Sequence, residues 1–295
     1  MKKVIMLLAI SLLTSSCLTS CRKDDLLNIK EDVQTSLDPT KPIQVFIFNG
    51  ESGSVGIAPN DSATSLELQP QGSLQIWNND SSKFQNLQIG VNNELGDIVL
   101  GAIGSNTSTY HGWELELCNL YKSISPNRNA FLIKTGQCGT SISQWDTLGY
   151  YNNMGVNFNP YLLMKSRIQN ALSQLRATGR PLQIFVLYDQ GINDNLYTHL
   201  AGNVWEQKTR DHLNRVKSII GQDVTFILTK HTADNGNDLY NSNIENLALS
   251  DSTGRTHFVE AATGLTMPDG NHYGYTGMKV ITQRMFSIIQ TEIHN

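Results

Sequence analysis

The sequence predicts an α/β fold, a three-layer α/β/α sandwich around a mostly parallel central sheet. From residue 43 onward, short apolar runs alternate with longer segments of helical periodicity. The apolar runs are nearly continuous, which is typical of strands covered by helices on both faces. Alternation of strands with helices indicates parallel strands joined by crossover helices.

Each element follows from local pattern. Buried strands are predicted over residues 43–48, 130–134, 183–188 and 224–229, with a weaker one over 256–259 and a short strand-like piece at 74–77. Helices are predicted over 113–121 and 205–220, and a third is opened by Asn159-Pro160, an N-cap residue followed by proline at the first helical position. The last helix carries its apolar face at Met278, Ile281, Met285 and Ile288.

The amino terminus is predicted to be a lipoprotein signal peptide covering residues 1–20. Lys2 and Lys3 precede an apolar run at 4–13, which is shorter than the roughly 20 residues needed to span a bilayer. Leu18-Thr19-Ser20-Cys21 resembles a bacterial lipobox, so Cys21 is the predicted lipid attachment site. The alternative is ordinary secretion with cleavage nearby.

Residues 21–42 are predicted to be a tether, and residues 43–295 a single folded domain. Asp24 and Asp25, close behind the lipid site, resemble a surface-export signal of Bacteroidetes-type lipoproteins. We therefore expect an exported bacterial lipoprotein in the outer membrane or at the cell surface, in contact with the membrane through its lipid anchor only.

Composition excludes some partners. The net charge of −4 argues against nucleic acid, and neutral sugars or esters would meet no repulsion. Cys118 and Cys138 allow two interpretations, a disulfide in an exported protein or two buried free thiols. Their spacing does not suggest a metal site, and no metal or cofactor is expected.

The chemistry is expected in polar loops that follow the strands, because ligands of parallel sheets bind beyond the carboxyl ends of the strands. Ser52 lies in a glycine-flanked turn after the first strand, Gly139 follows the second, and Gly191-Ile192-Asn193-Asp194 follows the third. A serine in such a bend can act as a nucleophile, with nearby N–H donors holding an oxyanion. Taken singly, each loop is better explained as an ordinary turn.

Asp269-Gly270-Asn271-His272 stands just before the last helix. A serine hydroxyl needs a base within hydrogen-bond reach, and histidine titrates near neutrality. A carboxylate beside the histidine fixes its tautomer. None of the other histidines has an acidic neighbour three residues upstream in a glycine-containing loop, so His272 is the preferred base. An exposed histidine beside a helix-capping aspartate is the alternative.

Together, these loops form the ordered block pattern of the SGNH (GDSL-type) hydrolases, and within that superfamily the chain most resembles the sialate O-acetylesterase-like carbohydrate esterases. Those read G-Q-S-N-M-x-G, G-G-T-S-L-x-x-W, W-x-Q-G-E-x-D and D-G-x-H-F. The matching stretches here are Gly50–Gly56, Cys138–Trp145, Tyr188–Asp194 and Asp269–Tyr273.

The resemblance implies a serine esterase that removes acetyl groups from carbohydrate esters. Ser52 would be the nucleophile, His272 the general base and Asp269 its orienting acid. The N–H groups of Ser52 and Gly139 and the side chain of Asn193 would form the oxyanion hole.

Three further residues, Glu51, Gln190 and Trp145, are candidates for substrate binding. Trp145, like Trp113 and Trp77, is either part of a sugar-stacking platform or a packing residue.

The chain departs from the family pattern at Glu51 (glutamine), Gly53 (asparagine), Cys138 (glycine) and Ile192 (glutamate). These changes spare the implied catalytic atoms and leave an alternative: a catalytically weak or inactive glycan-binding lipoprotein on the same fold. A lipase-like enzyme for long acyl chains is disfavoured by the polar loops.

Overall fold

The computed structural model describes residues 41–92, 110–124, 130–149, 151–153, 156–265 and 267–294. The predicted signal peptide, the lipid site at Cys21 and all but the last two residues of the tether lie outside these ranges. The division of the chain into signal peptide, tether and folded domain stays a prediction.

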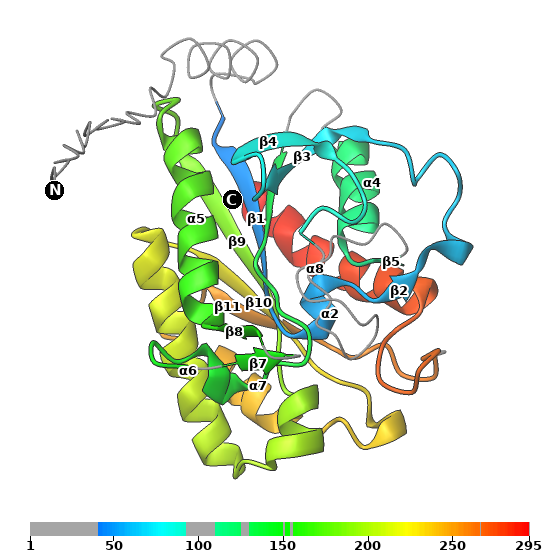
Figure 1. Ribbon diagram of the computed structural model, residues 1–295, viewed down its shortest axis with the longest axis vertical. Helices are drawn as coiled ribbons and strands as arrows, with labels where there is room; N and C mark the ends of the chain where they lie inside the picture. The colour runs from blue at the N-terminus through cyan, green and yellow to red at the C-terminus, as the bar shows by residue number, and fades with distance from the viewer. Residues whose placement is uncertain are drawn as a thin grey trace, which may run out of the picture. The chain divides into compact units, whose positions relative to one another are not determined.

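The central sheet has seven strands in the order β11-β10-β9-β1-β6-β3-β4 (Figure 1). All neighbours run parallel except β4, which pairs antiparallel with β3 at one edge. The strands are Ile43–Gly50 (β1), Gln71–Asn78 (β3), Lys83–Leu87 (β4), Ala130–Lys134 (β6), Leu182–Asp189 (β9), Thr225–Thr229 (β10) and Thr256–Val259 (β11). The predicted fold class is confirmed.

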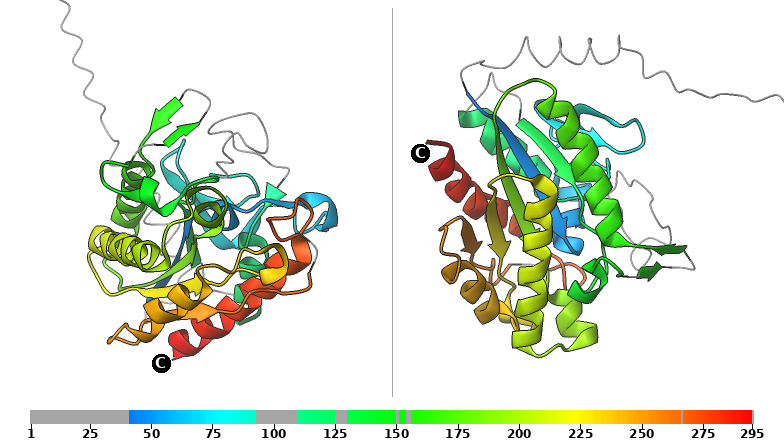
Figure 2. Two further views of the ribbon diagram at one scale, coloured as in Figure 1. Left: turned by 90° about the horizontal axis from the view of Figure 1, so that it is seen from below. Right: turned by 90° about the vertical axis from the view of Figure 1, so that its left-hand side faces the viewer.

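Helices cover both faces of this sheet, as Figures 1 and 2 show. Helices α4 and α8 pack together on one face, and α5 packs beside α6 on the other, where α7 also contacts α6 and β11. Their bounds are Glu114–Ile124 (α4), Pro160–Arg176 (α5), Gly202–Ile220 (α6), Asn241–Leu249 (α7) and Tyr275–His294 (α8). Helix α5 begins as predicted, because the Asn159 side chain accepts a hydrogen bond from the backbone N–H of Leu162 at 3.0 Å.

Strand β1 is the centre of the core, and all of its residues are buried. Its Phe46 ring stacks on Phe185 of β9 with centroids 5.6 Å apart and meets Tyr121 of α4 edge-on at 5.9 Å. Burying each such apolar side chain stabilises the fold by about 1.5–3 kcal/mol. This packing fixes the register of β1 against β9, which places Gly50 directly beside Asp189 at the carboxyl edge.

Cys118 and Cys138 are both buried and form no disulfide with each other, which favours the interpretation as buried thiols. Cys118 Sγ lies 3.4 Å from the Ser73 hydroxyl, and Cys138 packs against Val55 and Ile57.

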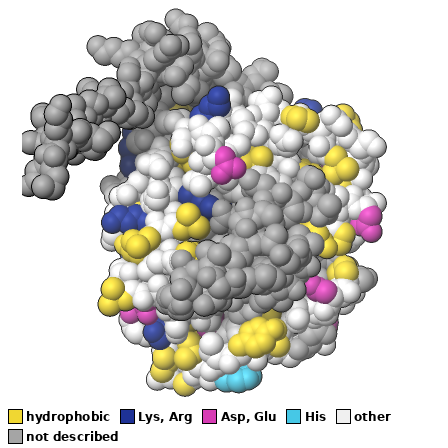
Figure 3. Space-filling model, in the orientation of Figure 1, with side chains coloured by type: hydrophobic (Ala, Val, Ile, Leu, Met, Phe, Trp, Pro, Cys, Tyr) yellow, Lys and Arg dark blue, Asp and Glu magenta, His cyan; other side chains and the backbone are white. Residues whose placement is uncertain are grey.

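The face drawn in Figure 3 shows no cluster of like charges among its described residues. On the described part of the face drawn in Figure 3, lysine and arginine side chains are scattered among uncharged groups rather than gathered. Among the described helices, none combines the length and the apolar character that crossing a membrane requires.

Candidate active site

The proposed nucleophile stands at the bend where β1 ends. Ser52 is the first residue of a single-turn helix, α2 (Ser52–Val55), and is 1% exposed. Gly50 allows the bend, because it has φ +117° and a Cβ there would lie 1.9 Å from the backbone oxygen of Asp189. Only glycine fits this close approach of two strand ends. The turn therefore fixes the Ser52 hydroxyl at the carboxyl edge of the sheet.

Residues 220 positions apart in the chain meet at this hydroxyl. His272 Nε2 lies 2.7 Å from Ser52 Oγ, and His272 Nδ1 lies 2.5 Å from Asp269 Oδ2. The other oxygen of Asp269 accepts the backbone N–H groups of Asn271 at 3.0 Å and His272 at 2.8 Å. The structure thus brings the three predicted catalytic side chains into one hydrogen-bonded series, which we call the relay.

Electrostatics keep Asp269 ionised. Partial burial alone would raise the pKa of its carboxyl group, but the hydrogen bond and charge of His272, with the two backbone N–H groups, lower that pKa to about 2. A carboxylate at Nδ1 holds the proton of the imidazole on that nitrogen, so Nε2 is left to accept a proton from Ser52.

The other two predicted oxyanion-hole residues lie on loops at the same edge. Gly139 is partly exposed with φ +73° in the turn after β6. Asn193 follows β9, and its side-chain amide donates a hydrogen bond to Glu51. A primary amide has two N–H donors, so this bond leaves one for a ligand. The oxyanion hole stays a prediction.

The three candidates for substrate binding are all buried, and their contact with a substrate stays a prediction. Trp145 is 0% exposed and donates its indole N–H to Thr140, so the packing interpretation holds. Gln190 donates to the Thr140 carbonyl and to Asp194, and Glu51 is 0% exposed. In the structure these side chains form hydrogen bonds with the active-site loops themselves.

Trp113 and Trp77 are also buried, which favours the packing interpretation for both.

Asp194 ties the third and second loops together. Its carboxylate accepts the backbone N–H of Ile142 at 3.0 Å, the side chain of Gln190 at 2.9 Å and the indole N–H of Trp205 at 3.2 Å. Burial raises the pKa of Asp194, although these hydrogen bonds oppose the shift. A buried carboxylate that accepts this many hydrogen bonds holds the two loops in a fixed position relative to each other.

A second histidine–carboxylate pair lies beside the relay and was missed from the sequence. His231 Nε2 is 2.6 Å from Asp189 Oδ1, which also accepts the Thr229 hydroxyl at 2.9 Å. Burial alone would lower the pKa of His231, but the Asp189 carboxylate raises it above its ordinary value. The sequence offers only their positions as a signal for this pair: Asp189 ends β9, and His231 follows the end of the neighbouring strand β10.

This pair explains the departure at Gly53. A Cβ at position 53 would lie 1.5 Å from Asp189 Oδ2, so the carboxylate fills the space that a side chain would need. Asparagine, which the family pattern has at this position, would clash with it.

Glu51, Asp189 and His231 lie close enough to be considered as metal ligands, with one atom from each within 4.8 Å of the others. The donor set fits a cation poorly. Each oxygen of Glu51 already accepts two N–H groups, which leaves it few lone pairs for a cation.

Two hollows differ in their relation to the relay. A cavity of about 20 Å³, room for about one water, is lined by Gly53, His272, Asp189 and His231 over an apolar base that includes Met278. A larger hollow, about 880 Å³, lies instead at the amino ends of β1, β9 and β10. Strand geometry puts that hollow at the opposite edge from Ser52.

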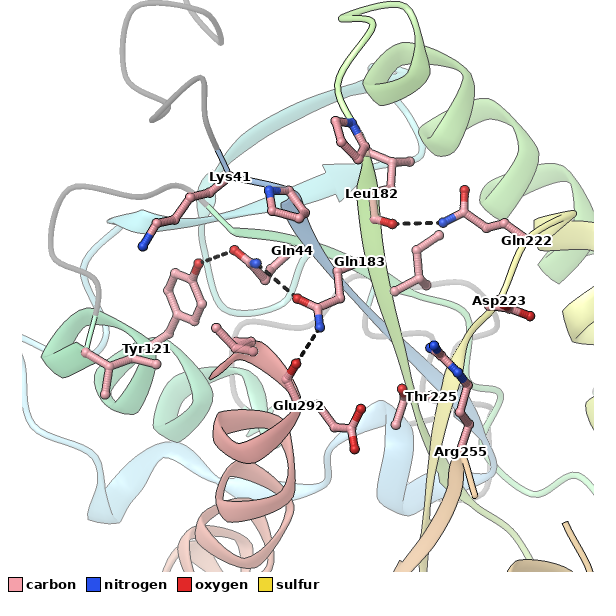
Figure 4. Close-up of a pocket in the computed structure, with 15 residues that line it drawn as sticks. Lys41, Gln44, Tyr121, Leu182, Gln183, Gln222, Asp223, Thr225, Arg255 and Glu292 are labelled. Atoms are coloured by element: carbon pink, nitrogen blue, oxygen red, sulfur yellow. Dashed lines mark hydrogen bonds between the residues drawn. The ribbon is translucent and has the colours of Figure 1, made fainter. Parts of the chain in front are cut away.

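Figure 4 shows the large hollow lined by amide side chains that bond to each other. Tyr121 donates to Gln44, Gln44 donates to Gln183, and Gln183 donates to the Glu292 carbonyl. These groups are satisfied within the protein, so the large hollow offers no counterpart to the relay.

Comparison with known proteins agrees with this architecture. Residues 42–291 match the family described as carbohydrate esterase, sialic acid-specific acetylesterase. A structure of an Arabidopsis thaliana protein has a TM-score of 0.63 at 17% identity, covering 85% of this chain and 99% of that one. NanS has a TM-score of 0.58 at 12% identity, covering 86% and 99%. Comparison with curated proteins gives no significant match.

Proposed function

The chain belongs to the carbohydrate esterase family of sialic acid-specific acetylesterases, and is thus a carboxylic ester hydrolase; from this premise we propose that it removes acetyl groups from carbohydrate esters through a Ser52–His272–Asp269 acyl-enzyme mechanism. The observation that carries the mechanism is the relay, in which one imidazole contacts the hydroxyl on one side and the carboxylate on the other. Such an arrangement is how proteins activate a serine hydroxyl.

In the first half of the reaction, the Ser52 hydroxyl gives its proton to His272 Nε2 as its oxygen attacks the ester carbonyl carbon. The tetrahedral intermediate carries its negative charge on the former carbonyl oxygen, where Gly139, Asn193 and the backbone N–H of Ser52 are the proposed donors. The bond to the sugar oxygen then breaks, and that oxygen takes the proton from Nε2. Acetyl-Ser52 remains.

In the second half, a water gives a proton to His272 Nε2 and attacks the acetyl carbonyl carbon. Collapse of the second tetrahedral intermediate breaks the bond to Ser52 Oγ, which takes the proton back, and acetate leaves. Asp269 holds the imidazole in one orientation and stabilises its charged form throughout.

Intact relay geometry favours turnover over the alternative of a glycan-binding protein without activity. A pure binder has no need of an imidazole held 2.7 Å from a buried hydroxyl and 2.5 Å from a carboxylate. The departures from the family pattern lie around the relay, not in it.

Acyl-chain preference tests the proposal. We expect p-nitrophenyl acetate to be hydrolysed with a kcat/KM at least about tenfold above that of p-nitrophenyl octanoate, because the described loops offer no broad apolar groove, and a methylene is worth roughly 1–3 kcal/mol only where a pocket receives it. Acetate release from acetylated glycans and sialic acids identifies the alcohol. Equal or faster octanoate turnover would contradict the short-acyl assignment.

A further inference from the structure

The residue before the nucleophile makes an unusual set of contacts. Glu51 is 0% exposed, and both oxygens of its carboxylate accept hydrogen bonds within the protein. One oxygen accepts the backbone N–H groups of Gly191 and Ile192, both at 2.6 Å. The other accepts the backbone N–H of Asn193 at 2.9 Å and also its side-chain amide. Three successive backbone N–H groups form an anion-binding nest, and here the anion is the protein's own side chain.

From these contacts we propose that Glu51 is a positioning residue of the esterase site, which holds the amide of Asn193 at a fixed place relative to Ser52. The proposal rests on the proposed function, in which Asn193 donates to the oxyanion. It assigns Glu51 a role that is distinct from substrate binding, since the side chain is enclosed.

The position of Glu51 in the chain couples the nucleophile to the Asn193 loop. Glu51 is covalently joined to Ser52, and its own backbone N–H donates to the Asp189 carbonyl at 2.7 Å. Its carboxylate accepts hydrogen bonds from the backbone of the loop that follows β9. The nucleophile and the proposed donor loop are therefore linked through one side chain, and Asn193 cannot shift relative to Ser52 without breaking charge-assisted hydrogen bonds, which are about twice as strong as neutral ones.

The surrounding charges are arranged around this carboxylate. Asp189, His231 and Asp194 are its charged neighbours, and the cationic form of His231 offsets Asp189 at 2.6 Å. Burial, followed by the Asp189 carboxylate, raises the pKa of Glu51 to about 7, although His231 and the N–H of Asn193 lower it. Glu51 is therefore ionised above about pH 7, and its removal leaves several buried donors without an acceptor.

The test is a double-mutant cycle with Glu51→Gln and Asn193→Ala, assayed with p-nitrophenyl acetate. We expect Asn193→Ala to lower kcat about 10²-fold, as loss of one oxyanion donor does. Glu51→Gln keeps the shape of the side chain but places a donor NH₂ opposite donor N–H groups. We therefore expect kcat to fall at least tenfold, with KM within about threefold of the wild-type value.

The double variant discriminates between mechanisms. If Glu51 acts through Asn193, the double variant loses less than about threefold beyond Asn193→Ala alone, well below the loss in Glu51→Gln, because no amide is left to position. A loss near the product of the two separate effects would overturn the proposal, as would an unchanged kcat in Glu51→Gln.

Glu116→Gln is the matched control. Glu116 is an almost buried carboxylate on α4 that accepts a hydrogen bond from Gln283 at 2.8 Å, and it lies outside the relay and its loops. If Glu51→Gln does not fold, Glu51→Asp keeps the charge on a side chain one methylene shorter, and the same cycle applies to it.

Hydrogen exchange separates failure of this inference from failure of the proposed function. In the wild-type protein the backbone N–H groups of residues 191–193 should exchange slowly, and in Glu51→Gln at least tenfold faster, whether or not the protein turns over an ester. Unchanged exchange would show that another group holds the loop. Fast exchange in the variant with no wild-type turnover would support the contact and remove the esterase assignment instead.

Discussion

Replacing Ser52 by alanine should lower kcat for p-nitrophenyl acetate by roughly 10⁴- to 10⁶-fold, the range found when a serine nucleophile is deleted. The reason is that the His272 imidazole then has no hydroxyl to deprotonate, and a water in the vacated space is poorly oriented for attack. Steady-state hydrolysis, measured with enough enzyme to detect the residual rate, provides the comparison.

The fold should survive this change. Ser52 Oγ makes its hydrogen bond to His272, and loss of one such bond costs about 1 kcal/mol of unfolding free energy. Ser54→Ala is the matched control, because Ser54 is an equally buried serine in the same turn whose hydroxyl donates to the Glu51 carbonyl at 2.7 Å. We expect Ser54→Ala to lower kcat by less than tenfold. Near wild-type turnover in Ser52→Ala would assign the nucleophile to another residue.

Asp269→Asn should produce the second largest effect, a loss of roughly 10²- to 10⁴-fold in kcat. An asparagine can present an N–H to His272 Nδ1, which favours the tautomer with its proton on Nε2, where it cannot accept one from Ser52. The loss is smaller than at Ser52, because the Asp269 side chain is 45% exposed and water replaces part of its role. The kcat of the variant at neutral pH is the measurement.

The same substitution has a pH signature in stability. The pKa of Asp269 falls from 3.8 to about 2 in the folded protein, so its contribution to stability is complete above about pH 4 and is lost as the pH falls toward 2. The Asp269→Asn variant should therefore lose less unfolding free energy than the wild-type protein as the pH falls from about 4 toward 2, as measured by urea unfolding.

Asp251→Asn is the control for both readouts. Asp251 also has its pKa lowered to about 2, against the opposing effect of burial, by hydrogen bonds from Thr256 and Thr253, but it lies in the turn between α7 and β11. We expect it to change acid stability and leave turnover unchanged. Equal loss of activity in the two variants would contradict an orienting role for Asp269.

The parallel core of the fold was predictable from sequence because its strands are buried on both faces and read as continuous apolar runs. Strand β4 was missed, since its sequence KFQNL is short and polar and takes its place only by pairing with β3 at the edge. Helix α7 was missed as well: it spans only nine residues and buries only Ile244 and Leu247 within its bounds. Edge elements depend on tertiary contacts that local pattern does not record.

Sequence order was enough to nominate Ser52, His272 and Asp269, because their chemistry requires a fixed set of residue types after strands. It was not enough to tell an exposed loop residue from an enclosed one: the candidates for substrate binding are buried and form hydrogen bonds within the protein, namely Trp145, Gln190 and Glu51. The Asp189–His231 pair has a sequence separation of 42 and no motif of its own. Only the sheet register brings its members together.

Peptide mapping of the protein after reaction with a fluorophosphonate probe tests the central claim most directly, because the probe reacts with an activated serine hydroxyl and leaves a covalent mark on it. The account predicts a single adduct on Ser52 that is lost in His272→Ala. An adduct on a different serine, or labelling of Ser52 that is equally fast without His272, would contradict it.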